Sequence, residues 1–147
     1  MCTPSLAIDA LIEVMHNGEP SIVLVKRRDP PRNVYAIPGG FVDIGETVEH
    51  AAHREAKEET NLDIEFEDIS QFHVYSDPKR DKRRHTVSAV MRCQVKSVES
   101  LHKGDDAKSV EIIPLHKVLS LDLAFDHREI LTDLLIKKYP NISHGVI

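Results

Sequence analysis

The stretch from Gly40 to Leu62, which reads GFVDIGETVEHAAHREAKEETNL, carries the most informative pattern of the sequence. Within it, the residues from Val48 to Glu59 are rich in Ala, Glu, Lys and Arg, which favour a helix. Thr47 is a suitable N-cap, and Asn61 can adopt the left-handed conformation in which many helices end. Residues 38–46, which begin with Pro-Gly-Gly, are expected to form an irregular loop.

Three glutamates share one face of this predicted helix. Glu55, Glu58 and Glu59 have i, i+3 and i+4 spacing, so they fall within a sector of about 100°. Small and aliphatic residues occupy the same face, which is therefore expected to point inward: Val48, Ala51 and Ala52. Other faces are expected to carry His50, His53, Lys57 and Thr60. The inward position argues against the alternative that the glutamates only cover a solvated surface.

The glutamate cluster predicts a metal site. At an effective dielectric constant of about 20, each pair of ionised neighbours would cost about 3 kcal/mol. Mg²⁺ prefers oxygen ligands, and it shares its remaining positions with water and substrate phosphates. Such an ion also polarises a phosphoryl oxygen and helps to form hydroxide from water. We therefore expect Mg²⁺, with Mn²⁺ as the alternative ion, and phosphate chemistry at this helix.

Alternating or β-branched segments on both sides of the helix predict strands. They cover residues 6–14, 22–25, 64–66, 72–75, 85–95 and 110–113, with a turn at Asn17-Gly18. Asp126 and Glu129 resemble a capping box that opens a final helix ending near Lys138. This order predicts an α/β sandwich around a central mixed sheet, formed by one domain over residues 1–147.

Composition excludes several classes of protein. The formal net charge of −5 argues against a general nucleic-acid binder, which needs an excess of basic residues. The only cysteines, Cys2 and Cys93, cannot build a disulfide framework. No apolar run approaches the length of a membrane span, and the N-terminus does not resemble a signal peptide. We expect a cytoplasmic protein with no nucleic-acid or membrane partner.

The stretch from Gly40 to Leu62 resembles the Nudix box, G-x5-E-x7-R-E-U-x-E-E-x-G-U, in which U is a bulky aliphatic residue. The corresponding residues are Gly40, Glu46, Arg54, Glu55, Ala56, Glu58, Glu59, Asn61 and Leu62. Ala56 is smaller than the usual aliphatic and Asn61 replaces glycine, but neither departure removes a metal ligand. The resemblance implies a Nudix-type α/β/α fold and metal-dependent hydrolysis of the pyrophosphate bond of a nucleoside diphosphate derivative.

The same resemblance implies roles for particular residues. Its metal ligands would be Glu55, Glu58, Glu59 and the carbonyl oxygen of Gly39. Glu58 would also act as the catalytic base, while Arg54 and Glu46 would support the catalytic helix and loop. Acidic residues outside the box remain alternatives for the base, namely Glu99, Asp105, Asp106 and Glu111.

Two segments beyond the box resemble the ADP-ribose pyrophosphatases of the Nudix family: Ser76–Asp81 with His85, and Leu123–His127. They imply hydrolysis of ADP-ribose to AMP and ribose 5-phosphate. Four residues are expected to contact this substrate: Arg28, Arg80, Asp81 and His127. Arg80 and the basic residues after it, up to Arg84, would meet phosphate, as could Arg27 and Arg28 at the end of an early strand. Asp81 would accept hydrogen bonds from ribose hydroxyls. A solvated basic loop, and a structural role for His127, remain the alternatives.

Two other functions stay open. The box is shared by hydrolases of sugar nucleotides, nucleoside triphosphates and dinucleoside polyphosphates. The fold can also serve as a module that senses a nucleotide without cleaving it. The intact set of Arg54, Glu55, Glu58 and Glu59 favours the enzyme, and the resemblance implies a homodimer.

Overall fold

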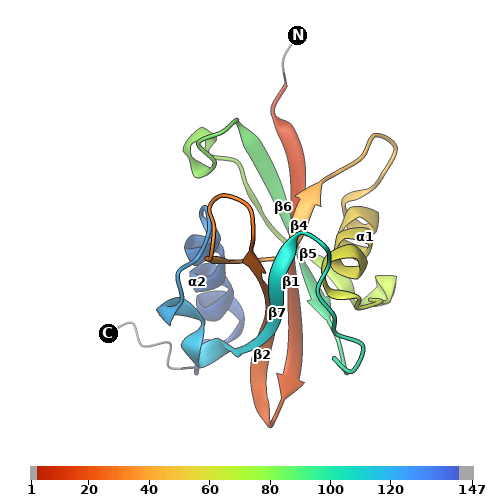
Figure 1. Cartoon of the computed structure of the whole chain (residues 1–147), viewed down its shortest axis with the longest axis vertical. Coiled ribbons are helices and arrows are strands. Elements are labelled where there is room, and N and C mark those ends of the chain that lie inside the picture. The colour runs from red at the N-terminus through yellow and green to blue at the C-terminus, as the bar shows by residue number, and fades with distance from the viewer. Residues whose placement is uncertain (1–2, 143–147) are drawn as a thin grey trace.

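A computed structural model describes residues 3–142 and places two α-helices on opposite sides of one sheet (Figure 1). The strands are β1 (Ser5–His16), β2 (Glu19–Arg27), β3 (Tyr35–Ala36), β4 (Gly39–Phe41), β5 (Ile69–Tyr75), β6 (Thr86–Gln94) and β7 (Ala107–Pro114). The helices are α1 (Val48–Thr60) and α2 (His127–Lys138), with short 3₁₀ helices at Phe66–Asp68, Pro78–Arg80 and Leu115–Ser120. The expected α/β sandwich with a mixed sheet is therefore confirmed. No helix among the described residues is long and apolar enough to cross a membrane.

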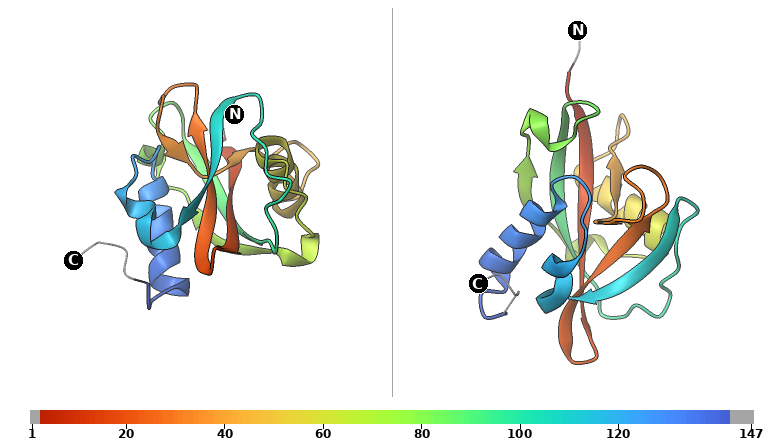
Figure 2. Two further views of the ribbon diagram at one scale, coloured as in Figure 1. Left: turned by 60° about the horizontal axis from the view of Figure 1, so that its bottom comes forward. Right: turned by 60° about the vertical axis from the view of Figure 1, so that its left-hand side comes forward.

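Strand β1 lies at the centre of the sheet, whose strand order is β3-β2-β1-β6-β5. It pairs with β6 in parallel and with β2 and β4 antiparallel, while β7 pairs with β2. All residues from Ala7 to Val14 are buried, because α1 covers one face of β1 and α2 covers the other. Both turned views of Figure 2 keep the two helices on opposite sides of the sheet. Polar side chains on β1 therefore lie between two apolar cores.

Helix α1 begins and ends as the sequence predicts. Thr47 Oγ1 accepts a hydrogen bond from the backbone N–H of His50 at 3.0 Å, and Asn61 is left-handed with φ 62°. Its core-facing residues are fully buried and short, namely Ala51, Ala52 and Ala56. These alanines let the helix pack directly against β1 and β4, which brings its glutamates to the edge of the sheet.

Two expectations about strands are wrong. Residues Gly39–Phe41 form β4 in place of the expected loop, and they pair antiparallel with Ala7–Asp9 of β1. Glycine makes this close pairing feasible, because a Cβ atom at Gly39 would lie 2.2 Å from the carbonyl oxygen of Ile8. Residues 64–66, expected as a strand, form none. The carbonyl oxygen of Ile64 lies 2.7 Å from Nδ1 of His53, so an imidazole takes the place of a neighbouring strand.

Helix α2 begins where the sequence predicts, but without the expected capping box. Asp126 makes no side-chain capping hydrogen bond. Both of its carboxylate oxygens accept hydrogen bonds from Arg80 instead. The helix is held by its apolar face, formed by Ile130, Leu131, Leu134 and Leu135. The start of α2 is therefore tied to the segment that follows β5.

Candidate active site

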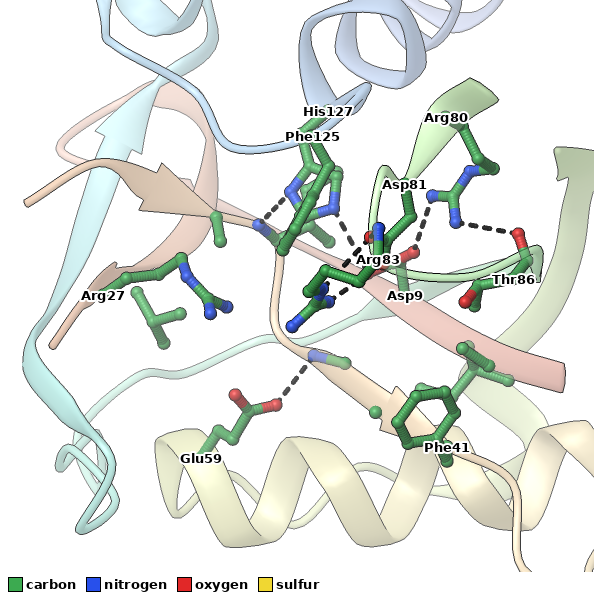
Figure 3. Close-up of a pocket in the computed structure, with 17 residues that line it drawn as sticks. Asp9, Arg27, Phe41, Glu59, Arg80, Asp81, Arg83, Thr86, Phe125 and His127 are labelled. Atoms are coloured by element: carbon green, nitrogen blue, oxygen red, sulfur yellow. Dashed lines mark hydrogen bonds and ion pairs between the residues drawn. The ribbon is translucent and has the colours of Figure 1, made fainter. Parts of the chain in front are cut away.

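Glu59 is the most constrained carboxylate of α1. Its Oε2 accepts a hydrogen bond from the backbone N–H of Gly39 at 2.7 Å (Figure 3). Burial raises the pKa of Glu59 to about 8, and nearby carboxylates contribute to this shift. They belong to Glu55, Asp9 and Glu58. The contact of Gly39 with this cluster is made by its N–H, whereas the resemblance implied its carbonyl oxygen.

Arg54 joins the loop before α1 to the glutamates. Its Nε and Nη2 donate to the two carboxylate oxygens of Glu46 at 2.7 and 2.8 Å. Nη2 also donates to the carbonyl oxygen of Phe41, and Nη1 donates to Oε1 of Glu55 at 2.9 Å. The hydrogen bonds from Arg54 lower the pKa of Glu46 to about 2. Arg54 and Glu46 therefore hold the loop against the helix and orient Glu55.

The faces of α1 differ from the expectation at two positions. Glu58 exposes 57% of its side chain, whereas Glu55 exposes 13%. Thr60, expected to point away from the core, is fully buried, and its Oγ1 donates to the carbonyl oxygen of Ala56 at 2.6 Å. Glu55 and Glu59 thus point inward, and Glu58 stays accessible to water.

Two adjoining cavities form a cleft between α1, β2, β4 and the loop before α2. The first, of about 420 Å³, has these charged residues in its lining: Glu55, Glu58, Glu59, Asp29, Asp105, Asp106, Arg27 and Arg28. The second, of about 220 Å³, is lined by Arg80, Asp81, Arg83, Phe125 and His127, among others (Figure 3). Both cavities are lined by Arg27, Gly39 and Glu59. A ligand with two linked parts can therefore lie beside the glutamates and beside the arginines at once.

Glycines let the walls of the cleft approach α1 closely. A Cβ atom at Gly40 would lie 2.3 Å from Oε1 of Glu55, and one at Gly104 would lie 2.6 Å from the carbonyl oxygen of Glu58. The N–H of Gly104 donates to the carbonyl oxygen of Glu59 at 3.0 Å. The loop that follows Gly104 is thereby held at the end of the helix.

The structure separates the alternatives for the catalytic base. Asp105 and Asp106 line the same cavity as Glu58. Glu111 lies on β7 and accepts a hydrogen bond from the hydroxyl of Tyr35 at 3.0 Å, while Glu99 lies outside both cavities. Glu58 and the two aspartates are therefore the candidates that face the cleft.

Arg80, expected to contact the substrate, lies in an internal ion pair. It exposes only 7% of its side chain, and its Nε and Nη2 donate to the carboxylate oxygens of Asp126 at 2.8 and 2.7 Å. Nη2 also lies 3.8 Å from Oδ2 of Asp9. Arg80 lines the second cavity, but its charge is balanced within the chain. Its contacts join the segment after β5 to the start of α2.

His127 and Asp9 position the backbone that leads into β4. The N–H of Ile37 donates to Nδ1 of His127 at 3.0 Å, and Nε2 of the same ring lies 3.5 Å from Asp9. Because Nδ1 accepts, Nε2 carries the proton that faces the carboxylate. Asp9 also accepts a hydrogen bond from Ser88 at 2.5 Å. Asp9 was not among the residues expected at the site, although a carboxylate in an apolar strand is a usable signal.

Asp81 and Arg28 also have partners within the chain. The two carboxylate oxygens of Asp81 accept hydrogen bonds from the guanidinium of Arg83 at 3.0 and 2.9 Å. The donors to Asp81 are therefore the guanidinium nitrogens of Arg83, whereas ribose hydroxyls were expected as its donors. Nη2 of Arg28 donates to the carbonyl oxygen of Asp105 at 2.7 Å, and Arg28 stays exposed beside the glutamates.

The chemistry of the glutamates fits a hard divalent cation. Within residues 3–142, no three carboxylate, imidazole or thiol groups already form a complete metal site. The carboxylate of Glu55 is turned toward Arg54. However, Glu55, Glu58 and Glu59 line one cavity, so three carboxylates meet there. Burial, together with the neighbouring carboxylates, raises the pKa of Glu59. Oxygen donors with excess negative charge are the ligands that Mg²⁺ and Mn²⁺ prefer.

Comparisons with known proteins agree with this geometry. Residues 5–134 match the NUDIX domain family. The chain is 42% identical over 133 residues to the ADP-ribose pyrophosphatase of Methanocaldococcus jannaschii, covering 90% of this chain and 73% of that protein. It is also 30% identical over 132 residues to the ADPR responsive transcriptional repressor NtrR of Acinetobacter baylyi, covering 88% of this chain and 52% of the repressor.

A solved structure adds a bound nucleotide to the comparison. The bifunctional NMN adenylyltransferase/ADP ribose pyrophosphatase of Francisella tularensis, crystallised with AMP and a Mn ion, is 30% identical with a TM-score of 0.80. The alignment covers 93% of this chain and 42% of that one, so this chain spans about half or less of the repressor and the bifunctional enzyme. The family match extends over most of the sequence, and the chain therefore belongs to the NUDIX domain family.

Proposed function

We propose that the chain hydrolyses ADP-ribose to AMP and ribose 5-phosphate, using a divalent cation held on α1. The family and the 42% identity to a pyrophosphatase make it a Nudix pyrophosphohydrolase. One observation carries the substrate and metal proposal: three glutamates, Glu55, Glu58 and Glu59, line a cavity that continues into an arginine-rich one. Carboxylates suit the metal, and guanidinium groups suit phosphate.

Glu55, Glu58 and Glu59 would hold Mg²⁺ or Mn²⁺, and the carbonyl oxygen of Gly39 would add a further ligand. When bound, such an ion polarises a phosphoryl oxygen and lowers the pKa of water. Glu55 would exchange its hydrogen bond with Arg54 for the ion. Arg54 would keep its two contacts with Glu46, so the loop and the helix would stay joined.

Glu58 would accept the proton of the attacking water, because it is the exposed carboxylate of the cluster. Asp105 and Asp106 face the same cavity and are the alternative bases. In the reaction one water is consumed, the bond between a phosphorus and the bridging oxygen breaks, and each product carries one phosphate. Arg28, at the edge of this cavity, would meet a phosphate oxygen.

The shape of the cleft supports a substrate with two parts. ADP-ribose carries a nucleoside and a sugar on the two sides of one diphosphate, and two adjoining cavities meet at Gly39 and Glu59. The relatives from M. jannaschii and F. tularensis are both described as ADP-ribose pyrophosphatases. Three of the residues expected to contact the substrate would act on it indirectly, by positioning the residues that they bind: His127, Asp81 and Arg80.

The first test is the release of AMP from ADP-ribose by the purified chain with millimolar Mg²⁺. An EDTA sample is the control, and sugar nucleotides, nucleoside triphosphates and dinucleoside polyphosphates run in parallel. We expect metal-dependent release of AMP with ADP-ribose as the preferred substrate. Preference for another nucleotide would overturn the substrate, and equal activity in EDTA would overturn the role of the metal.

A nucleotide-sensing module is the second candidate, because the chain is 30% identical to a repressor described as ADPR responsive. It would bind ADP-ribose in the same cleft without cleaving it. Calorimetry with Mg²⁺ decides between the two. Stable binding with no AMP formed after hours favours the sensor, and AMP formation favours the enzyme.

We also propose that the chain is a single domain that forms a homodimer in the cytoplasm and has neither nucleic acid nor a membrane as a partner. Light scattering of the purified protein tests the dimer, and a fluorescent fusion tests the location.

A further inference from the structure

Phe125 lies between two guanidinium groups in the second cavity. The Cζ atom of Arg27 is 5.1 Å from the centre of its ring, and the Cζ atom of Arg83 is 4.9 Å from it. Both distances are within the range of a cation–π interaction. Figure 3 shows the three side chains reaching the cavity from different segments. We call Arg27, Phe125 and Arg83 the arginine clamp.

Local irregularities of the backbone build this clamp. The pairing of β2 with β7 shifts register between Lys26 and Arg27, and such bulges redirect the side chain that follows. Phe125 has a φ of 53°, which is unfavourable for a bulky residue and typical of functional sites. Its ring packs on an apolar cluster formed by Val25, Ala36, Ala107 and Ala124. The backbone is thus held in a strained conformation that keeps the ring between the arginines.

Arg83 is presented to the cavity by Asp81. Asp81 exposes 8% of its side chain and binds Arg83 through both oxygens, while Arg83 itself exposes 60%. The backbone N–H of Arg83 also donates to Asp81 at 2.9 Å. A buried carboxylate therefore fixes the direction of an exposed guanidinium.

Arg27 is short of acceptors. Within residues 3–142, no carboxylate lies within ion-pair distance of it, and its Nη2 donates only to the carbonyl oxygen of Pro30 at 2.8 Å. Its Nε is buried and has no hydrogen-bond partner. Burial lowers the pKa of Arg27, and the charge of Arg83 lowers it further, although the charges of Asp29, Glu59 and Asp81 act in the opposite direction. Two guanidinium groups that contact the same ring, one of them without a carboxylate within ion-pair distance among residues 3–142, form a site that favours an anion.

We propose that the arginine clamp binds the non-bridging oxygens of the substrate's diphosphate, so that Arg27 and Arg83 hold its charge while Phe125 keeps them apart. The inference rests on the proposed function, and it names the residues that recognise the diphosphate. Arg27 lines both cavities together with Glu59, so a phosphate held there lies next to the glutamate cluster. Arg80 is excluded from this role because its side chain is only 7% exposed and pairs with Asp126, whereas Arg83, although it pairs with Asp81, exposes 60% of its side chain.

Stacking of the adenine on Phe125 is the competing interpretation. Both guanidiniums lie over the ring, so a base would first have to displace one of them. A diphosphate can bind to both guanidiniums without displacing either of them from the ring. The geometry therefore favours the anion.

The test compares the binding of ADP and of adenosine by calorimetry in millimolar Mg²⁺, with the full chain and its variants. The variants are Arg27→Met, Arg83→Ala and Phe125→Leu, which keeps an apolar side chain without a π face. Arg84→Ala is the matched control, because Arg84 lies over the ring of Phe41 at 5.2 Å and lines neither cavity. Thermal unfolding confirms that each variant is folded.

We expect Arg27→Met and Arg83→Ala to weaken ADP binding by about 10- to 100-fold, the range for one charged hydrogen-bonded contact. Phe125→Leu should weaken it about two- to fivefold, and adenosine binding should stay unchanged. Equal affinity of the wild-type chain for ADP and adenosine would overturn the clamp. So would equal losses for both ligands, which would assign the site to the nucleoside, or a loss for Arg84→Ala as large as for Arg83→Ala.

Failure of the clamp and failure of the proposed function can be told apart. If the wild-type chain releases no AMP but its ADP binding depends on Arg27 and Arg83, the hydrolase proposal fails and the clamp stands. If AMP is released and the KM for ADP-ribose is unchanged in both arginine variants, the clamp fails and the hydrolase stands.

Discussion

Glu13 and Glu59 are two glutamates with opposite surroundings. Glu13, on β1, exposes 2% of its side chain and accepts hydrogen bonds from Nη2 and Nε of Arg92 at 2.6 and 2.8 Å. The hydroxyl of Tyr139 donates to it as well. Glu59, on α1, accepts one hydrogen bond, from Gly39, and its pKa is raised by burial and by its carboxylate neighbours.

The difference shows how one fold uses two carboxylates for two purposes. The charge of Glu13 is balanced by the chain itself, outside both cavities, and it ties β1 to β6 and to the end of α2. The charge of Glu59 is left for a partner that enters the cleft. Breaking the first should therefore reduce stability, and breaking the second should reduce activity.

The largest effect is expected for Glu59→Gln. Turnover of ADP-ribose should fall by about a thousandfold, because a bound metal contributes several kcal/mol of charge stabilisation. The melting temperature should stay the same or rise, because the substitution replaces one of several neighbouring carboxylates, whose charges repel one another, by an uncharged amide. Glu49→Gln, on the same helix but outside the cleft, is the control for kcat and melting temperature. If Glu59→Gln is destabilised but keeps normal turnover per folded molecule, Glu59 has the same structural role as Glu13 and the contrast between them is refuted.

Glu13→Gln should show the reverse pattern. Removing the charge leaves Arg92 partly buried without its partner, which costs about 3 to 5 kcal/mol of unfolding free energy. Turnover per folded molecule should equal that of the wild-type chain. Urea unfolding and steady-state kinetics measure the two quantities. A large loss of turnover in fully folded protein would contradict the structural role.

Asp9→Asn should fall between these two variants. Asp9 is buried like Glu13, but it faces His127, which holds the N–H of Ile37 next to β4. We expect about 1 to 3 kcal/mol of lost stability, from one disturbed charged hydrogen bond, and about a tenfold loss of kcat, from the displaced support of β4. Ser88→Ala is the control, because it removes one donor to Asp9 and leaves the charge. Equal effects of the two variants on kcat would argue against positioning by the carboxylate.

The smallest effect is expected from Glu46, which lies beside the site but is paired like Glu13. Arg54 lowers its pKa from 4.5 to about 2, so the ionised form is favoured in the folded chain. Glu46 therefore stabilises the fold above pH 4.5, and this contribution is lost as the pH falls from 4.5 toward 2. The gap in unfolding free energy between wild type and Glu46→Gln should shrink over that window. A gap that stays constant from pH 7 to pH 2 would refute the assignment.

Local patterns were enough to predict helix α1. Thr47 caps it and Asn61 ends it, because both features depend on residues within a few positions in the chain. Local patterns failed for β4, where Gly39 pairs with Asp9 of β1 although β2 and β3 lie between them in the chain. They also failed for Thr60, whose burial depends on what packs against the helix.

The residues that carry the chemistry could be identified from the sequence: three glutamates on one helix, an arginine beside them, and basic residues downstream. Their spacing along the chain is a local property, so it can be read without a structure. The tertiary structure was needed to show which charges pair within the chain and which stay available to a ligand. Arg80 pairs with Asp126, 46 positions away, while Arg27 lies over the ring of Phe125 and has no carboxylate within ion-pair distance among residues 3–142. An ion pair depends on distances in space, and these distances are set by the order of the strands and by the packing of the helices.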